Sequence, residues 1–346
     1  MLPGAIAWVI VGLVMLAISA KFSPGTGDLL TTICGFICLA QSWNVIAGYG
    51  GQVSLGTSAF AGVGAYSAAL VAIHLQLPAT FMLLFGLVAG TLLALLLAVP
   101  LLRLRGDYFS IGTLVASLAL QAWALNWSFV GGSTGLSLPL ESLPAPLQVL
   151  RLSIVVATVS MLAAWTIAHS RVGLRLRAVR DDEGAARGVG VSGFLSRALA
   201  LCVSGGLAGL AGALIAIQQI SFEPTGMLGL GWTVSALLMT VVGGPGSVLG
   251  PVFGVVIVYW GLTKQLAGRE SASIVIEGAL LLLIVRFAPA GVWPSLVSLV
   301  RGGVARSRHQ PSNPDAASAP HAPPTAAATN GSRQQSQDEG SSTLGA

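Results

Sequence analysis

The chain has 346 residues, of which 54% are hydrophobic and only 8% are charged. Soluble domains carry about 25% charged residues, so this chain cannot cover a folded surface with enough polar side chains to stay dissolved. Three Cys exclude a disulfide scaffold, and the 44 Gly show no collagen repeat. The composition therefore predicts an all-α, polytopic integral membrane protein. The net charge of +5 comes from sparse cations between apolar runs, which indicates membrane topology and no partner nucleic acid.

A helix that crosses the bilayer needs about 20 mostly apolar residues. We expect about ten such helices. The first is interpreted as a membrane helix and not a secretion signal, because it lacks a basic start and further spans follow at once. In chain order the predicted spans are Ala5–Ala20, Leu29–Ala47, Leu55–Ile73, Ala79–Leu102, Phe109–Trp127, Leu152–His169, Ala198–Ile220, Met227–Val242, Gly250–Thr263 and Ser273–Phe287.

The charges between these spans predict the orientation of the chain. If the N-terminus lies in the cytoplasm, thirteen of the seventeen Lys and Arg fall in cytoplasmic segments. This agrees with the positive-inside rule, and an even number of spans then places both termini in the cytoplasm. The expected organisation is a membrane domain over residues 1–300 and a disordered cytoplasmic tail over residues 301–346, because the tail is rich in Pro, Ala, Ser, Gln and Gly.

The first unusual segment is Gly48–Gly56, which interrupts two apolar runs with Gly and Ser. Irregular backbone near the bilayer is tolerated where it is buried in protein or lines a wet cavity. One interpretation is a broken helix that lines a translocation path, with Gln52 and Ser54 facing it. The other is a tight turn between two helices, and the local pattern favours neither.

A second segment of the same kind is Gly243–Pro251, with Gly243, Gly244 and Ser247 as further candidates for the path. Paired Gly/Pro interruptions in two halves of a transporter mark binding sites. The two segments are therefore interpreted as possible corresponding points of an internal repeat. Chance similarity of glycine-rich stretches is the alternative.

The longest polar stretch between the spans is residues 171–196. Acidic residues followed by small ones predict a short helix, since acids favour a helix N-terminus and glycine favours its end. Such a helix could seat in a groove on another protein, whereas an ordinary positive-inside loop is the simpler alternative. The residues of interest are Arg180, Asp181, Asp182, Glu183, Ala185, Ala186 and Gly190.

Two further patterns have structural or functional readings. Gly205, Gly209 and Ala213 recur at a spacing of four, which predicts close packing against another helix. Glu277 is an acidic residue near one end of the last span, and a role in a path is the less favoured interpretation. No Ser-His-Asp, paired-acid or metal-ligand pattern stands out, so neither catalysis nor a metal site is predicted.

The order of these motifs resembles the permease subunits of branched-chain amino acid ABC importers, of the LivM type, over about residues 33–293. Each block is a modest signal, but six in the right order are specific. Departures are Thr57, where the family usually has His, and Gly184, where a bulkier residue is common. The blocks are Gly48–Gly56 with Phe60, Gly62 and Gly64–Tyr66; Leu102–Phe109 with Thr113 and Leu114; Asn126 with Gly131–Leu136; Ala178–Glu183 with Ala185, Ala186 and Gly190; Ala208–Gly212; and Gly243–Pro251.

The resemblance implies a subunit of the bacterial inner membrane that forms the path for branched-chain or related apolar amino acids. It implies as partners two P-loop ATPase subunits that dock on residues 171–196, a second permease of the LivH type, and a periplasmic or lipoprotein solute-binding protein. ATP and Mg would bind to the ATPase subunits. No cofactor is expected to bind to this chain, which has no Gly-x-x-x-x-Gly-Lys-Ser/Thr loop. The alternatives are an ion-coupled secondary transporter, which would need charges buried mid-span, and a membrane scaffold.

Overall fold

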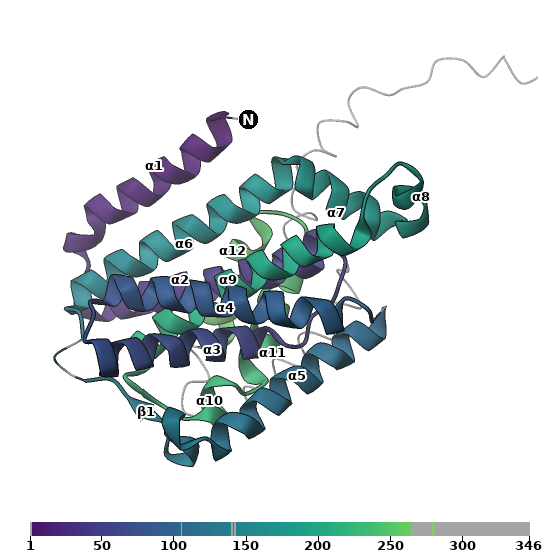
Figure 1. Ribbon diagram of the computed structural model, residues 1–346. Coiled ribbons are helices and arrows are strands. Elements are labelled where there is room, and N and C mark those ends of the chain that lie inside the picture. The colour runs from purple at the N-terminus through teal and green to yellow at the C-terminus, as the bar shows by residue number, and fades with distance from the viewer. Residues whose placement is uncertain (1, 105, 140, 142, 264–278, 280–346) are drawn as a thin grey trace, which may run out of the picture. The chain divides into compact units, whose positions relative to one another are not determined.

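Helices make up nearly all of the regular structure in the computed structural model, which describes residues 2–104, 106–139, 141, 143–263 and 279 (Figure 1). The long helices are α1 (Leu2–Ile18), α2 (Pro24–Trp43), α3 (Thr57–Leu70), α4 (Ala79–Leu101), α5 (Asp107–Asn126), α6 (Pro146–His169), α7 (Arg171–Asp181), α9 (Gly193–Gln219) and α11 (Gly231–Gly243). Shorter helices are α8 (Glu183–Gly188), α10 (Pro224–Met227) and α12 (Gly250–Val255). Short 3-10 or π-helical segments are η1 (Ser19–Lys21), η2 (Asn44–Tyr49), η3 (Val71–Leu75), η4 (Ser128–Val130), η5 (Gly132–Thr134) and η7 (Val256–Thr263), and the strands are β1 (Leu136–Ser137) and β2 (Ser221–Phe222).

Eight helices among the described residues are long and apolar enough to cross a membrane. They correspond to the first eight predicted spans, so the all-α, multi-span class is confirmed. The ninth predicted span coincides with α12 and η7, which contain a shorter apolar helix, Gly250–Tyr259. Apart from residue 279, the tenth predicted span lies outside the described residues, as do Glu277 and the tail, and the cytoplasmic placement of both termini stays a prediction.

The most deeply buried helix is α9, and α2, α3 and α4 pack around it (Figure 1). In a bilayer, helices gain little by burying apolar side chains, so close backbone approach through small residues drives their association. A Cβ atom added at Gly209 would lie only 2.3 Å from the carbonyl oxygen of Gly86 in α4. One added at Gly205 would lie 2.5 Å from Cβ of Ala94, and Gly86 in turn faces Ala213. The structure thus places all three residues of the predicted packing stripe against α4.

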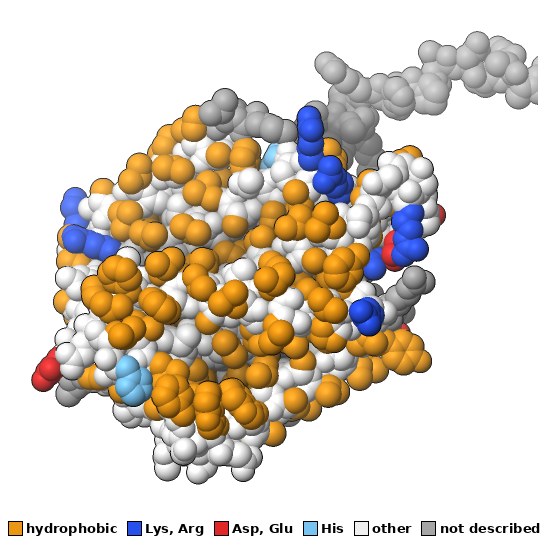
Figure 2. Space-filling model, viewed as in Figure 1, with side chains coloured by type: hydrophobic (Ala, Val, Ile, Leu, Met, Phe, Trp, Pro, Cys, Tyr) orange, Lys and Arg blue, Asp and Glu red, His pale blue; other side chains and the backbone are white. Residues whose placement is uncertain are grey.

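The outer helices carry large apolar side chains on their exposed faces. On α4, Leu92, Leu95, Leu96 and Val99 are all exposed, which suits contact with lipid. Figure 2 shows hydrophobic side chains across the visible face, with Lys and Arg gathered at its edges and several beside α7 and α8. This distribution is the one expected of a protein whose apolar belt is surrounded by hydrocarbon.

A two-stranded antiparallel pair closes one end of the helix bundle. Leu136 of β1 lies opposite Phe222 of β2, and Leu138 N donates to the carbonyl oxygen of Ile220 at 2.8 Å. The pair ties the connection between α5 and α6 to the end of α9. Residues 171–196 lie at the opposite ends of α6 and α9 and hold the candidate site.

Candidate functional site

Residues 171–196, which we call the docking segment after the role predicted for them, are mostly helical and do not form an extended loop. Its first part, α7, begins where the side chain of Ser170 accepts a hydrogen bond from Gly173 N at 3.3 Å. Leu176 and Val179 lie on the buried face of α7, whereas Arg175 and Leu174 are exposed. This apolar stripe at helical spacing anchors α7 to the membrane domain and leaves its other face free.

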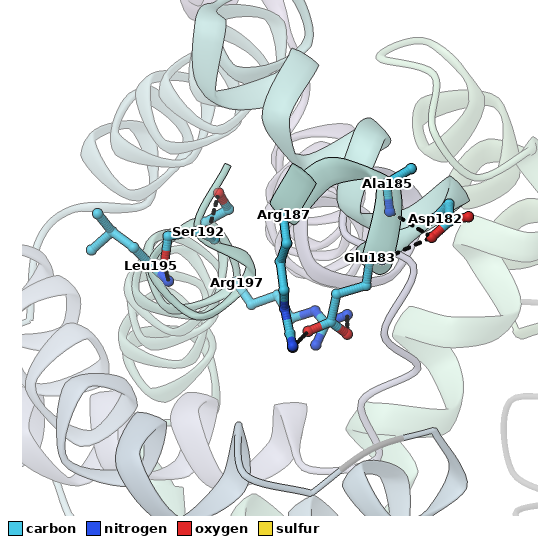
Figure 3. Close-up of polar contacts among 9 residues, drawn as sticks. Asp182, Glu183, Ala185, Arg187, Ser192, Leu195 and Arg197 are labelled. Atoms are coloured by element: carbon cyan, nitrogen blue, oxygen red, sulfur yellow. Dashed lines mark hydrogen bonds and ion pairs between the residues drawn. The ribbon is translucent and has the colours of Figure 1, made fainter. Parts of the chain in front are cut away.

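The short helix predicted from the acidic residues is present as α8 (Figure 3). Asp182 is its N-cap, and its side-chain oxygen accepts hydrogen bonds from Gly184 N at 2.8 Å and Ala185 N at 3.0 Å. After α8 ends, Gly190 has a φ of +79°, and Val191 N donates to the carbonyl oxygen of Ala186 at 2.9 Å. The chain therefore turns back sharply after α8. In this short helix Ala186 is buried and Ala185 is exposed.

Glu183 connects α8 to α9. Its carboxylate forms ion pairs with Arg187 on α8 and with Arg197 on α9, the latter at 2.8 Å (Figure 3). Partial burial raises the pKa of the Glu183 carboxyl, but the hydrogen bonds from both arginines outweigh it, so the pKa is lowered. The Glu183 side chain is 25% exposed and that of Arg197 is 14% exposed, so this pair is shielded from solvent better than an ordinary surface ion pair.

The two glycine-rich segments meet. We call their meeting point the glycine junction, formed by residues 48–56 and 243–251. Asn44 Oδ1, in the π-helical turn η2, accepts a hydrogen bond from Gly246 N at 2.8 Å, and its Nδ2 donates to Ser247 O at 2.8 Å. Gln41 Nε2 donates to Val248 O at 2.6 Å. Both amides are buried, so they satisfy backbone groups that would otherwise lie unpaired in the protein interior.

Arg180 connects the docking segment to the glycine junction. Its Nη1 donates a hydrogen bond to the carbonyl oxygen of Gly48 at 2.8 Å. Its aliphatic stem lies against Gly51, where an added Cβ would be 2.2 Å from Cγ of Arg180. One helical turn earlier, the guanidinium of Arg177 lies over the ring of Tyr49, 5.8 Å from its centroid. The end of α7 and the end of η2 are therefore in direct contact.

The predicted path residues differ in their surroundings. Ser54 is buried, and its Oγ accepts from Gly56 N at 3.3 Å. Ser247 Oγ donates to Gly244 O and accepts from Gly250 N, while an added Cβ at Gly243 would meet the carbonyl oxygen of Gly250. These hydroxyls cap the local backbone. Their role in a path stays a prediction.

Gln52 lies beside the docking segment. It lines a cavity of about 260 Å³ between residues 50–53, the start of α5 and the docking segment, together with Asp107, Arg180 and Arg197. Its Oε1 atom is buried and has no hydrogen-bond partner among the described residues. Of the predicted path residues, Gln52 is therefore the one placed at a cavity that also touches Arg180.

Sequence reasoning missed Gln41, Asn44 and Arg197. Gln41 and Asn44 are spaced to share a helix face in an otherwise apolar span, and their side chains bond each other at 3.1 Å. A polar pair at this spacing in a membrane helix is the signal that could have found them. Among the described residues, no group of three or more His, Cys, Asp or Glu could hold a metal ion.

Comparison with known proteins identifies the family of this chain. Residues 25–285 match the family described as branched-chain amino acid transport system / permease component. The chain belongs to this family. It is 27% identical over 323 residues to the high-affinity branched-chain amino acid transport system permease protein LivM of Escherichia coli (strain K12), covering 82% of this chain and 74% of LivM. The resemblance to the LivM type is thereby confirmed.

Other members of the permease family match a shorter part of the chain. The autoinducer 2 import system permease protein LsrC of Enterobacter sp. (strain 638) is 35% identical over 167 residues, 47% of this chain and 46% of that protein. LsrC of Salmonella typhi is 29% identical over 180 residues, half of each chain. The relatives are thus permeases named for different cargoes, so similarity at this level identifies a membrane permease and not its cargo.

Proposed function

We propose that this membrane permease is a subunit of an ATP-driven importer of the bacterial inner membrane and forms the path for branched-chain or related apolar amino acids. Separate P-loop ATPase subunits bind the docking segment and supply the energy. A second permease of the LivH type and a solute-binding protein outside the membrane complete the assembly. ATP and Mg bind the ATPases, and this chain carries no cofactor.

The observation that carries the proposal is the geometry of α8. This helix is capped by Asp182, closed by the turn at Gly190 and held to α9 through Glu183. Three of its exposed residues, Gly184, Ala185 and Gly188, are small, so a groove on another protein can approach the helix closely there. Six arginines lie between residues 171 and 197, which supports a cytoplasmic position where an ATPase would find it.

The described spans favour an ATP-driven importer over an ion-coupled transporter. Ion coupling needs ionisable residues buried near the middle of the membrane. In the described spans the charged residues lie near helix ends, as Asp28 in α2, Asp107 in α5 and Arg151 in α6 illustrate. The cargo proposal has a different basis, which is the family description and the name of LivM.

The mechanism we propose uses two states of the membrane domain. Closure of the ATPase subunits on ATP moves α8 together with α7 and the start of α9, to which it is bonded. That movement biases the helices toward one of two facings, since a ligand acts on a conformational equilibrium only through different contacts in the two states.

The first test is co-purification of the tagged chain from its own cell membranes in mild detergent. Recovery of a P-loop ATPase and a second multi-span protein, followed by ATP-dependent uptake of leucine, isoleucine or valine into proteoliposomes, supports the proposal. Recovery of the chain alone, folded and moving solute without ATP, overturns it in favour of a secondary transporter. ATP-dependent uptake of a different solute overturns the cargo.

A matched pair of variants tests the docking segment. Ala185→Trp places a bulky side chain on the exposed face of α8, and we expect loss of the ATPase from the purified complex while the second permease remains. Ala145→Trp, at the exposed opposite end of α6, is the control and retains the ATPase. Ala186 and Gly190 are poorer choices, because Ala186 is buried and Gly190 needs its positive φ. Equal ATPase recovery in both variants contradicts docking at α8.

A further inference from the structure

Under the proposed function, on which this inference rests, movement of the docking segment must reach the membrane helices through contacts with the glycine junction. The described contacts between α7 and the glycine junction centre on Arg180 and Arg177. The Arg177 Nη2 atom is already bonded to Ala168 O at 2.8 Å, at the end of α6. Arg180 bonds instead to Gly48, at the point where both glycine-rich segments meet.

We propose that Arg180 is the positioning residue that transmits movement of the docking segment to the glycine junction. It occupies the next-to-last position of α7, two residues before the cap of α8. Any displacement of α8 by an ATPase therefore acts on the backbone that carries Arg180. The far end of the same side chain is bonded to a residue 132 positions earlier in the chain.

The two glycine-rich segments of the junction contact each other so closely that they move together with the carbonyl group of Gly48. A Cβ atom added at Gly48 would lie 2.5 Å from Gly246 N, and one added at Gly246 would lie 3.2 Å from Gly48 O. Asn44 bonds both Gly246 and Ser247, so Gly48 cannot shift far without the second segment. Four helices meet at this junction: α2 with η2 and α11 end there, and α3 and α12 begin there.

The Arg180 contact is poorly suited to a purely stabilising role. Its side chain is 47% exposed, and the nearby Asp181 carboxylate, 3.5 Å from Nε, is 72% exposed. An exposed ion pair such as Arg180–Asp181 contributes about 0 to 1 kcal/mol to stability, because water and salt screen it. A hydrogen bond of 2.8 Å is nevertheless sensitive to position, since a shift of about 1 Å takes the pair beyond hydrogen-bond distance. When α7 moves, either the glycine junction moves with it or the hydrogen bond between Arg180 and Gly48 breaks.

The stem of Arg180 makes the contact directional. It lies over Gly51, whose φ of +68° and missing Cβ let the stem approach. The guanidinium bonds Gly48, and the stem fills the space that a side chain at Gly51 would need. Movement of α7 toward the junction is opposed by contact with Gly51, and movement away is opposed by the bond to Gly48.

The test uses the complete importer with its ATPases, second permease and binding protein. Arg180→Met keeps an aliphatic stem and removes the donor, and Arg180→Gln shortens the stem and keeps a neutral donor. The control is Arg103→Gln, between α4 and α5 and outside the docking segment, where Arg103 is exposed and makes no hydrogen bond or ion pair with any described residue. Solute moved per ATP hydrolysed is measured together with hydrogen exchange of the amides of Gly51 and Gln52, which are bonded to Ala47 O and Ile46 O.

We expect both Arg180 variants to retain the ATPases and to hydrolyse ATP, with solute moved per ATP reduced about ten-fold, the worth of one charge-assisted hydrogen bond. In wild type and Arg103→Gln, ATP changes exchange in the docking segment and at the reporter amides. In the Arg180 variants it changes exchange in the docking segment only. A purely structural role predicts loss of assembly or a change in the reporter amides before ATP is added, and that result overturns the proposal.

Unchanged transport per ATP in either Arg180 variant also overturns it. Failure of the proposed function is distinguishable, because the wild-type chain would then bind no ATPase or show no response to ATP before any variant is compared.

Discussion

Asn44 Oδ1 accepts a hydrogen bond of 2.8 Å from the backbone N–H of Gly246, which lies 202 residues later in the chain. The same amide donates to Ser247 O and to Gln41 Oε1, so one side chain uses both of its polar atoms to hold the two glycine-rich segments together. All of this occurs at a fully buried side chain. The glycine junction therefore depends on an amide supplied by a helix that sequence analysis described only as a span.

We predict that Asn44→Leu destabilises the membrane domain by about 2 to 6 kcal/mol, because two partly buried backbone groups lose their partner at about 1 to 3 kcal/mol each. The measurement is thermal unfolding in detergent, followed with a thiol-reactive dye that reports exposure of the buried Cys34 and Cys38. Asn126→Leu is the control, since Asn126 is exposed and bonds only the Ala122 carbonyl of its own helix. Similar unfolding temperatures for the two variants would show that the junction tolerates unpaired groups.

The packing of α4 on α9 gives a second prediction. Gly209→Ala places a Cβ 2.3 Å from the carbonyl oxygen of Gly86, and this backbone cannot rotate away as a side chain can. Forcing the two helices apart costs about 1 to 3 kcal/mol, the range found for overpacked cores. The same unfolding assay measures it.

Gly231→Ala is the control for this substitution, because nothing lies within 4 Å of an added Cβ at that position. We expect no loss of stability there. If Gly209→Ala also unfolds at the wild-type temperature, α4 and α9 have room to separate and the close approach is not required.

A third prediction concerns the pH dependence of α8. The arginines hold the pKa of the Glu183 carboxyl below its usual value of 4.5. A carboxyl with a lowered pKa in the folded state contributes stability above its unfolded pKa and loses it as the pH falls through the lowered value. The ordering of α8 is therefore constant at neutral pH and declines below about pH 4.5.

Hydrogen exchange of the Ala186 and Val191 amides measures this ordering, since they are bonded to Asp182 O and Ala186 O. At pH 7, Glu183→Gln should exchange about three- to ten-fold faster than wild type, since it loses a charge-assisted contact. The difference should shrink toward zero in acid. A difference that persists unchanged at pH 3 would mean that the carboxylate charge is not what orders α8.

The parts of this structure that could be predicted from the sequence are those set by neighbouring residues. Spans follow from the hydropathy of about 20 consecutive residues, and the α8 helix follows from Asp182 and the small residues after it. The backbone amides that Asp182 caps are only two and three positions away. Local physics of this kind does not depend on the rest of the fold.

The parts that could not be predicted are pairings between distant residues. The two glycine-rich segments were proposed as corresponding points of a repeat, and the structure adds that they touch each other through Asn44. The bond from Arg180 to Gly48 joins two segments whose sequences give no sign of their partner, because a carbonyl group exists at every residue. Such contacts depend on how α2, α7 and α11 pack together, and this packing is known only from the folded structure.

The last prediction separates strain from contact at Gly51. Its φ of +68° costs a residue with a side chain about 1 kcal/mol, and an added Cβ also meets the Arg180 stem at 2.2 Å from Cγ. We expect Gly51→Ala to destabilise wild type by more than the conformational cost alone, and to destabilise Arg180→Ala by less, because Cγ and Cδ are then absent. The free energies of unfolding of wild type, both single variants and the double variant form the cycle that measures this coupling. Equal costs of Gly51→Ala in both backgrounds would mean that the Arg180 stem does not press on the glycine junction.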